Sequence, residues 1–304
     1  MIRGGCSRFS LTVRPIVKTP NNVSDEYAQL QRQYYDSRIV TEQDAKTLVG
    51  CYNEGANTMP SIAQFVLDEY RQRQYKKPQR ALNLLDFGCG VGRIMEAFKH
   101  LGIQCVDGVD ISQKMLTFAG QNPALKDSRF YLTSGSDCGA APQGHYDLVT
   151  SLFCLQHICH HDNRMSILRS MRECLSDEGM VAIEMQFFPT CSSDNIPGNH
   201  AAWSENKVSS VTNSEADVWI TFDKLGECVR DISECFADLA FYFVDIYDLD
   251  AYEREHSAAT INYQYPFQHV YFFGGKHRRV AKEVCNKQWR RPRLLDRLKR
   301  ACCQ

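Results

Sequence analysis

The sequence contains no long hydrophobic run. No stretch of its 304 residues approaches the ~18 consecutive apolar residues of a spanning helix, so we expect no transmembrane segment. Residues 1–24 also lack the apolar core of a secretory signal, and they contain four basic residues but no acidic one. We interpret them as a disordered basic leader; a mitochondrial presequence is the alternative.

Signs of export are also missing, although the chain has 14 cysteines. Without export, a disulfide framework is not expected. Cys89, Cys105 and Cys174 fall in segments that resemble strands or a helix, where reduced cysteine acts as a small hydrophobic residue. We therefore expect reduced thiols and a cytoplasmic protein.

Acidic residues are scarce at both ends of the chain. The net charge is −1, but residues 276–304 carry +9 and residues 1–24 carry +4, which leaves −14 for the part between them. Nucleic-acid affinity comes mainly from neutralised phosphates, so an acidic body argues against a nucleic-acid partner. The basic segment 289–304 places Leu294, Leu295, Leu298 and Cys302 on one helical face, which resembles an interfacial helix attracted to anionic lipid. We interpret the segment first as a solvated tail, with peripheral membrane contact as the alternative.

The most informative segment is residues 84–93, where an apolar run ends in Asp86 and glycine follows as Gly88, Gly90 and Gly92. Glycine lacks Cβ, so it tolerates unusual backbone angles and lets a ligand approach closely. A helix that follows such a turn directs free N–H groups into it. The segment therefore predicts a bound cofactor, with a spacing that differs from the G-x-G-x-x-G dinucleotide fingerprint.

Three further segments follow in order. Residues 103–112 have the pattern of a second strand that ends in Asp110, whose carboxylate can accept hydrogen bonds from both hydroxyls of a ribose. Residues 130–137 resemble a third strand with its polar loop, and residues 146–158 a fourth strand and the segment after it. An acid after the second strand is also found in NAD enzymes, so Asp110 alone does not identify the cofactor.

Together these four landmarks resemble the motifs of the class I S-adenosylmethionine (SAM) dependent methyltransferases. The resemblance extends from about Ala81 to Phe187. It implies that Asp86 and the glycines line the methionine and sugar side of SAM, and that Asp110 binds the ribose. The cofactor-binding residues that it implies are Asp86, Gly88, Cys89, Gly90, Gly92, Asp110, Ile111, Ser136, Asp137, Leu152 and Phe153.

Two parts of this implied site are less specific. The sequence has Gly135-Ser136-Asp137 where Gly-Asp is common in the family, so the adenine contact falls on either Ser136 or Asp137. Leu152 and Phe153 would border the transferred methyl group.

Methyl transfer from a sulfonium is a direct displacement, which requires alignment of the acceptor and, where needed, removal of a proton. His157 is the candidate base or acceptor-orienting residue, because imidazole titrates near neutral pH. Packing at the start of the next helix is the alternative role. Glu184 and Gln186, near the end of the fifth expected strand, are candidate polar contacts of the acceptor.

The run from Cys154 to Asp162 contains cysteine, histidine and aspartate, the ligand types that suit zinc. It lacks a C-x-x-C pair or a second ligand set at standard spacing. We interpret His160-His161-Asp162 as a polar turn in which Asp162 caps the next helix, and we expect no metal.

Strand and helix patterns alternate from Ala81 onward, which predicts parallel strands joined by helices. We expect an α/β, Rossmann-like seven-stranded mostly parallel sheet with helices on both faces and an antiparallel last strand. The expected strands lie near residues 82–87, 104–109, 128–133, 146–152, 179–186, 240–247 and 268–274. Two amphipathic helices are expected near residues 162–176 and 222–237.

The expected organisation has three parts after the leader. Residues 25–78 form an N-terminal helical cap, with Tyr34, Tyr35 and Tyr52 as candidate lid residues; residues 79–275 form the SAM-binding domain; and residues 276–304 form a basic tail. Residues 186–219, rich in Pro, Ser and Asn, are expected to be a loop that contributes to the acceptor pocket.

The sequence therefore favours a SAM-dependent enzyme that methylates O or N of a small-molecule acceptor. Three alternatives stay open: methylation of a lipid-linked glycan at the membrane surface, a SAM-binding regulatory or scaffold protein without turnover, and a nucleotide-dependent oxidoreductase.

Overall fold

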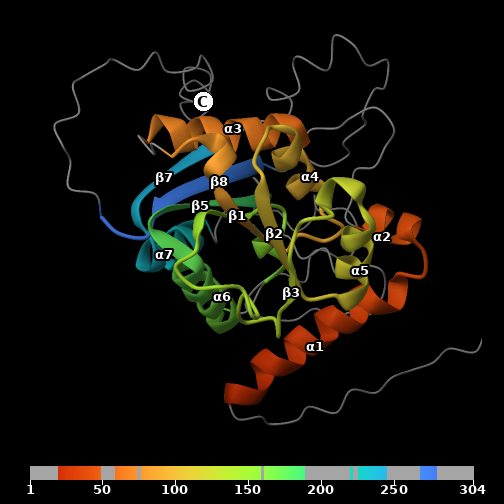
Figure 1. Ribbon diagram of the computed structural model, residues 1–304. Helices are drawn as coiled ribbons and strands as arrows, with labels where there is room; N and C mark the ends of the chain where they lie inside the picture. The colour runs from red at the N-terminus through yellow and green to blue at the C-terminus, as the bar shows by residue number, and fades with distance from the viewer. Residues whose placement is uncertain are drawn as a thin grey trace, which may run out of the picture.

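The computed structural model describes residues 20–48, 59–73, 77–158, 161–188, 220–221, 225–244 and 268–278. These residues form one sheet flanked by helices (Figure 1). Most of the expected leader and acceptor loop, the basic tail beyond residue 278, and Tyr52 lie outside the described residues.

The sheet has the order β3-β2-β1-β4-β5-β8-β7. Its strands are β1 (Asn83–Phe87), β2 (Cys105–Asp110), β3 (Phe130–Leu132), β4 (Tyr146–Ser151), β5 (Leu175–Phe188), β6 (Ile220–Thr221), β7 (Ala237–Val244) and β8 (Gln268–Gly275). Strands β1 to β5 pair in parallel, and β8 runs antiparallel to both β5 and β7. The predicted Rossmann-like sheet with an antiparallel last strand is confirmed.

Strand β5 is longer than predicted, because it begins at Leu175 and continues to Phe188. The expected loop from residue 186 therefore starts as strand. Phe187 is fully buried and pairs with Ile220 of the unpredicted two-residue strand β6, which extends the hydrogen-bonded ladder.

The helices are α1 (Pro20–Arg38), α2 (Glu42–Leu48), α3 (Met59–Gln72), α4 (Arg93–His100), α5 (Gln113–Gln121), α6 (His161–Cys174) and α7 (Leu225–Cys235). Short 3-10 turns, η1 (Gln79–Ala81), η2 (Pro123–Leu125) and η3 (Leu155–His157), join some of them to the strands. Helix α1 begins at Pro20, inside the expected leader, at a position where proline suits the first helical turn. None of the described helices has the length and hydrophobicity that a membrane crossing requires.

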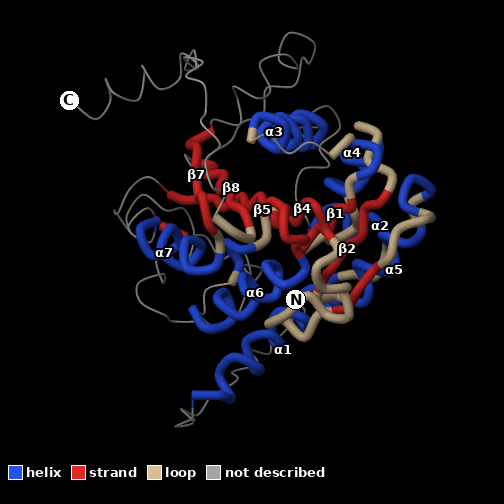
Figure 2. Tube along the Cα trace, turned by 60° about the vertical axis from the view of Figure 1, so that its left-hand side comes forward, coloured by secondary structure: helices blue, strands red, loops and turns tan. Residues whose placement is uncertain are grey.

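Alternate strand residues pack on opposite faces of the sheet. Leu84, Leu148 and Ala182 pack with α3 and α4, whereas Val149 and Ile183 pack with α6 and α7. Figure 2 shows α3 and α4 on one side of the strands and α6 and α7 on the other. Each large apolar side chain that is fully buried contributes about 1.5–3 kcal/mol, so the sheet is stabilised by one apolar cluster on each face.

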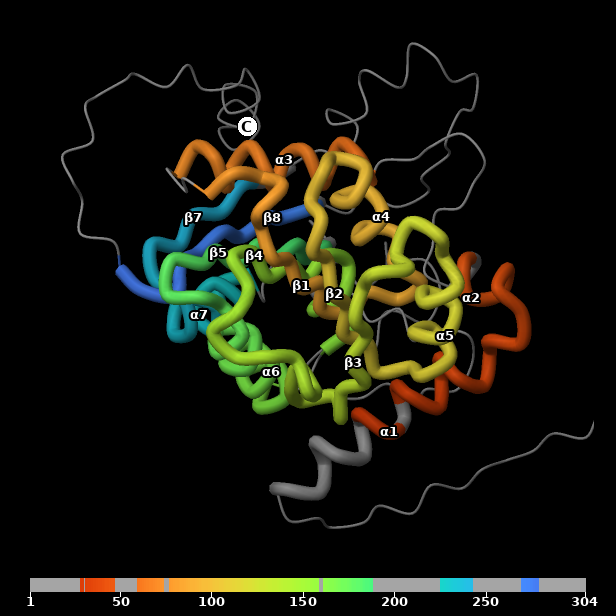
Figure 3. The backbone as a smooth tube through the Cα atoms, viewed as in Figure 1, coloured from red at the N-terminus to blue at the C-terminus, as the bar shows by residue number. Residues whose placement is uncertain are grey.

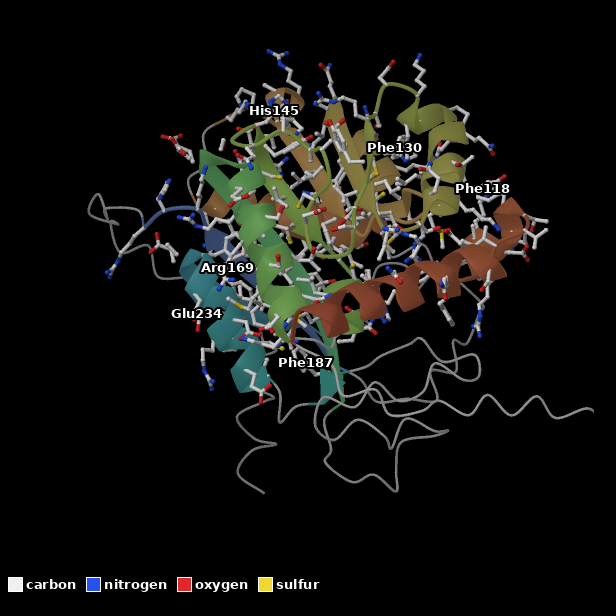
Figure 4. All side chains as sticks on the ribbon, turned by 90° about the horizontal axis from the view of Figure 1, so that it is seen from below. Phe118, Phe130, His145, Arg169, Phe187 and Glu234 are labelled. Carbon is white, nitrogen blue, oxygen red and sulfur yellow. The ribbon has the colours of Figure 1, made fainter. Side chains whose placement is uncertain are left out.

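The parallel strands all end at the same edge of the sheet. Figure 4 shows His145, just before β4, at the end of the molecule opposite to Phe187, near the end of β5. Helix α1 crosses near the Phe187 end, and in Figure 3 it lies beneath β3 and α5. The carboxyl edge is where ligands bind in open α/β sheets, so the candidate site is sought there.

Candidate active site

The turn after β1 depends on glycine for both its backbone angles and its space. Gly88, Gly90 and Gly92 have φ values of +78°, +53° and +83°, in the left-handed region that glycine tolerates best. A Cβ on Gly88 would lie 2.3 Å from Sγ of Cys154, so this position also has no room for a side chain. Gly92 immediately precedes the first turn of α4, whose N–H groups face the turn.

The backbone after β1 is tied to the end of β2. The amides of Gly88 and Cys89 both donate to the carbonyl of Val109, at 2.8 and 3.0 Å. The Cys89 side chain is buried, and this burial raises the pKa of its thiol well above the usual value. Cys89 therefore lines the turn as a neutral group.

Asp110 holds the glycine turn and the start of α5 together. One carboxylate oxygen accepts from the amide of Gly90 at 2.8 Å, and the other accepts from the amide of Ser112 at 2.9 Å. Burial raises the pKa of Asp110, while these amide bonds lower it. Each carboxylate oxygen has a second lone pair, which leaves acceptor capacity for a ribose.

Asp86, at the end of β1, is a buried acid with an unused oxygen. Oδ1 accepts from the Thr150 hydroxyl at 2.7 Å, whereas Oδ2 has no hydrogen-bond partner among the described residues. Burial raises the pKa of Asp86 to about 8; the Thr150 hydrogen bond opposes this, and the charge of Asp110 adds to it. The site therefore contains a protonated acid that a cationic ligand would ionise.

The loop after β3 is organised by Asp137. Its carboxylate accepts from the hydroxyls of Thr133 and Ser134 and from the amide of Gly139. Burial would raise the pKa of Asp137, but these hydrogen bonds lower it on balance. Asp137 thus shapes the loop, and the half-buried Ser136 is the other predicted adenine contact.

Helix α1 is attached along the carboxyl edge by side chains that the sequence analysis did not single out. Gln31 donates to the carbonyl of His157 at 2.7 Å. Arg32 donates to the carbonyls of Ile111 and Thr133 at 3.2 and 2.8 Å, which links the ends of β2 and β3. These bonds hold the helix against the predicted ribose and adenine contacts.

A second attachment of α1 lies beside Asp110, the predicted ribose contact. The Ser112 hydroxyl donates to Asp36 Oδ1 at 2.5 Å, and Lys114 donates to the Asp36 carbonyl at 2.6 Å. The expected lid residues behave differently, since Tyr34 and Tyr35 pack edge to face against each other at 5.3 Å between ring centroids. Arg32 and Asp36, which are four residues apart in α1, therefore attach the helix, and no sequence signal distinguishes them from the tyrosines.

The segment after β4 contains Leu152 and Phe153, the residues predicted to border the methyl group. Leu152 is buried, and Phe153 is half-buried with a φ of +60°, which is uncommon for a residue with a side chain. The amide of Phe153 donates to Oε2 of the buried Glu184 at 2.8 Å. A non-glycine residue in this region of backbone space stores about 1–3 kcal/mol of strain, and such residues gather at functional sites.

His157 ends the short turn η3 and is half-buried, next to α1. A different histidine, which the sequence analysis did not consider, lies across the sheet: Nδ1 of His269 on β8 is 2.5 Å from Oε1 of Glu184. His269 was missed because 85 residues separate it from Glu184, and β8 brings the two together only through pairing with β5.

The metal hypothesis concerned residues 154–162. Among the residues that the structure describes, no three His, Cys, Asp or Glu side chains form a group that could hold a metal ion. Cys159 and His160 lie outside the described residues. Asp162 is the second residue of α6 and not the residue before it, because the helix already begins at His161.

Part of the chain is similar in sequence to known methyltransferases. A family described as "Methyltransferase domain" matches residues 84–179. The ubiquinone biosynthesis O-methyltransferase of Thiobacillus denitrificans is 34% identical over 85 residues, which is 27% of this chain and 36% of that protein. The chain therefore spans little more than a third of the length of this curated relative.

Solved structures show the same fold. The plantazolicin methyltransferase BamL, in complex with a triazolic desmethylPZN analog and SAH, superposes with a TM-score of 0.55 at 15% identity, covering 84% of this chain and 99% of that one. Phosphoethanolamine N-methyltransferase 2 of Haemonchus contortus, in complex with SAM, superposes with a TM-score of 0.53 at 16% identity, covering 80% of this chain and 59% of that one. Residues 84–179, which include the glycine turn and Asp110, therefore resemble a methyltransferase domain, and the fold is the one seen in these solved methyltransferase structures.

Proposed function

We propose that the chain binds SAM at the carboxyl edge of the sheet and transfers its methyl group to O or N of a small-molecule acceptor. The observation that carries this proposal is the carboxylate of Asp110, held by the Gly90 and Ser112 amides at the mouth of the glycine turn. SAM supplies an activated methyl group on a sulfonium. The chain supplies the contacts that orient it and a buried environment that excludes water.

The residues present fit this cofactor. SAM carries positive charge, and the unpartnered Oδ2 of Asp86 is a buried acceptor beside the glycine turn, with no hydrogen bond from the described residues. Asp110 provides acceptors for two ribose hydroxyls. A nicotinamide dinucleotide would share the ribose contact, so Asp110 alone does not separate the two cofactors.

The small-molecule class of acceptor is supported by what similar proteins are named for. The relative from Thiobacillus denitrificans is named for ubiquinone biosynthesis, and BamL for plantazolicin. The −14 charge of residues 25–275 supports the same class, since it opposes binding to nucleic acid.

Titration calorimetry with SAM, S-adenosylhomocysteine and NAD tests the cofactor directly. We expect binding of SAM and S-adenosylhomocysteine and none of NAD. Tight binding of NAD without binding of SAM would overturn the proposal. Transfer of labelled methyl groups to pooled metabolites then separates an enzyme from a SAM-binding regulatory protein.

SAM binding should release a proton from Asp86. In the free protein a pKa of about 8 keeps Asp86 mostly protonated at pH 7. A cationic ligand favours the ionised form, so about one proton should leave per SAM bound, and affinity should rise with pH up to about 8 and then level off. Calorimetry at pH 7 in buffers of different ionisation enthalpy measures this proton count.

The matched control for this prediction is Asp86→Asn, which keeps the shape and the Thr150 contact but cannot ionise. We expect the buffer dependence at pH 7 to fall by about one proton in this variant. An identical buffer dependence in both proteins would show that Asp86 does not ionise on binding.

We also retain peripheral membrane contact as a proposal, together with a cytoplasmic location and a lipid-linked acceptor. It is supported by the +9 charge of residues 276–304 and the leucines of the tail, most of which lies outside the described residues. We expect the full chain to sediment with vesicles that contain anionic lipid, and deletion of residues 289–304 to abolish this. Equal binding with and without the tail would contradict the idea.

A further inference from the structure

The α3 side of the sheet carries a polar patch where β5 and β8 meet. Gln186 lies opposite His269 and Glu184 lies opposite Tyr271, so in this antiparallel pair all four side chains project from the same face. The same face is apolar closer to the middle of the sheet, at Ala182 and elsewhere. Glu184, Gln186 and His269 are each at least nine-tenths buried, so the change from apolar to polar occurs inside the protein, at the carboxyl edge.

Glu184 connects this patch to the methyl side of the site. Its Oε2 accepts from the amide of Phe153, and its Oε1 lies 2.5 Å from Nδ1 of His269. The rings of Phe153 and His269 also pack edge to face, with centroids 5.7 Å apart. One buried side chain thus holds both the left-handed Phe153 and the imidazole.

The contacts of Glu184 determine which ring nitrogen of His269 is basic. A carboxylate accepts hydrogen bonds, so Nδ1 is the protonated nitrogen of a neutral imidazole in this arrangement, and Nε2 carries the lone pair. If Nε2 takes up a proton, the adjacent carboxylate stabilises the resulting imidazolium. The same division of roles between acid and imidazole operates in hydrolytic triads.

Gln186 adds a second acceptor on the same face. Its Oε1 is buried and has no hydrogen-bond partner among the described residues. A buried polar atom without a partner is unfavourable, so such atoms in native proteins call for an explanation. A ligand group that donates a hydrogen bond would satisfy this oxygen.

We propose that Gln186 and His269 bind the acceptor's hydroxyl or amine group, that His269 removes its proton, and that Glu184 positions the imidazole. This inference rests on the proposed function. The patch suits a neutral acceptor with two donor hydrogens, from an amine or from a hydroxyl and a neighbouring hydroxyl, because Nε2 of His269 and Oε1 of Gln186 each accept one hydrogen bond. A carboxylate would require a donor in their place.

Atoms and electrons balance in the proposed step. A lone pair of the acceptor's O or N forms a bond to the methyl carbon as the bond from that carbon to sulfur breaks, and the electron pair stays on sulfur to give S-adenosylhomocysteine. The proton of the acceptor passes to Nε2 of His269. The imidazolium, held by Glu184, returns this proton to water after the product leaves.

The first test needs no acceptor. Nitrogen-15 NMR of the histidine-labelled full chain reports which ring nitrogen is protonated, and His269→Asn identifies the His269 signals. We expect a proton on Nδ1 and an unprotonated Nε2 at pH 7, and loss of this fixed tautomer in Glu184→Gln. A proton on Nε2, or a doubly protonated ring, would overturn the inference because the ring could not then accept a proton.

The second test uses SAM with a labelled methyl group and a pooled small-molecule extract. We expect His269→Asn to lower kcat by about 100-fold or more, the contribution typical of a general base, with unchanged SAM affinity by calorimetry. Glu184→Gln should lower kcat more than it raises the KM for the acceptor, as a positioning role requires. The control is His100→Asn, an exposed histidine at the end of α4.

The possible results distinguish a failure of this inference from a failure of the proposed methyltransferase function. If the wild-type chain fails to bind SAM, the proposed function is wrong. The NMR test does not depend on SAM, so it still shows whether Nε2 of His269 can accept a proton. If SAM binds and methyl transfer occurs, but His269→Asn retains wild-type turnover while His157→Asn loses it, then the base is His157 and this inference is wrong.

Discussion

Replacing Asp110 with alanine should weaken SAM binding by about 100-fold or more. The variant loses the acceptor for the ribose hydroxyls, and each hydrogen bond to a charged group contributes about 1.5–3 kcal/mol. It also releases the amide of Gly90, one of three backbone amides that hold the glycine turn at the end of β2. Calorimetry with SAM measures the affinity directly.

The same variant should remain folded, which makes its binding defect interpretable. Burial raises the pKa of Asp110, so its charge is poorly solvated and removing it offsets part of the lost amide bonds. A control with the same chemical change is Asp127→Ala, at an exposed position after η2. Wild-type SAM affinity in Asp110→Ala, together with a native melting curve, would exclude the ribose role.

The parts of the site that could be predicted from the sequence are those encoded locally. The turn at Gly88, Gly90 and Gly92 needs backbone angles that few residues other than glycine adopt, so the requirement is visible in the residues themselves. Asp110 follows a strand pattern and precedes the helix start at Ser112, so its place at the sheet edge follows from parallel topology.

The parts that could not be predicted depend on distant pairing. Gln31 and His157 are 126 residues apart, and Arg32 and Thr133 are 101 apart, yet α1 brings each pair into contact. A polar helix face has the same pattern whether it meets water or backbone carbonyls, so nothing in the pattern favours these residues over the tyrosines.

His269 illustrates the same limit within the sheet. Its strand was predicted, but the residue it faces depends on the register between β5 and β8, and a shift of one residue would turn it to the other face. The early start of β5 was missed because the segment near Leu175 was interpreted as the end of the preceding helix. Register and strand ends are tertiary properties, and the acid–imidazole pair depends on both.

Gly88→Ala should be the most damaging single change in the glycine turn. A residue with Cβ in the left-handed region is less stable by about 1–2 kcal/mol, and overpacking adds about 1–3 kcal/mol. The overpacking is specific, because the new Cβ would lie 2.3 Å from Sγ and 2.5 Å from Cβ of Cys154. We expect the free energy of unfolding to fall by about 2–5 kcal/mol, measured by chemical denaturation.

A double variant separates the two causes of this loss. Cys154→Gly removes both atoms that the new Cβ would meet, so Gly88→Ala in that background should lose only the backbone part, about 1–2 kcal/mol. The single variant Cys154→Gly is the baseline for this comparison, because the new glycine at position 154 itself lowers the free energy of unfolding through its backbone flexibility. Equal losses in both backgrounds would mean that backbone angle alone requires glycine at position 88. A smaller loss in the Cys154→Gly background would show that the turn after β1 is constrained by its contact with the segment after β4, so that the predicted methionine and methyl sides of the site pack as one unit.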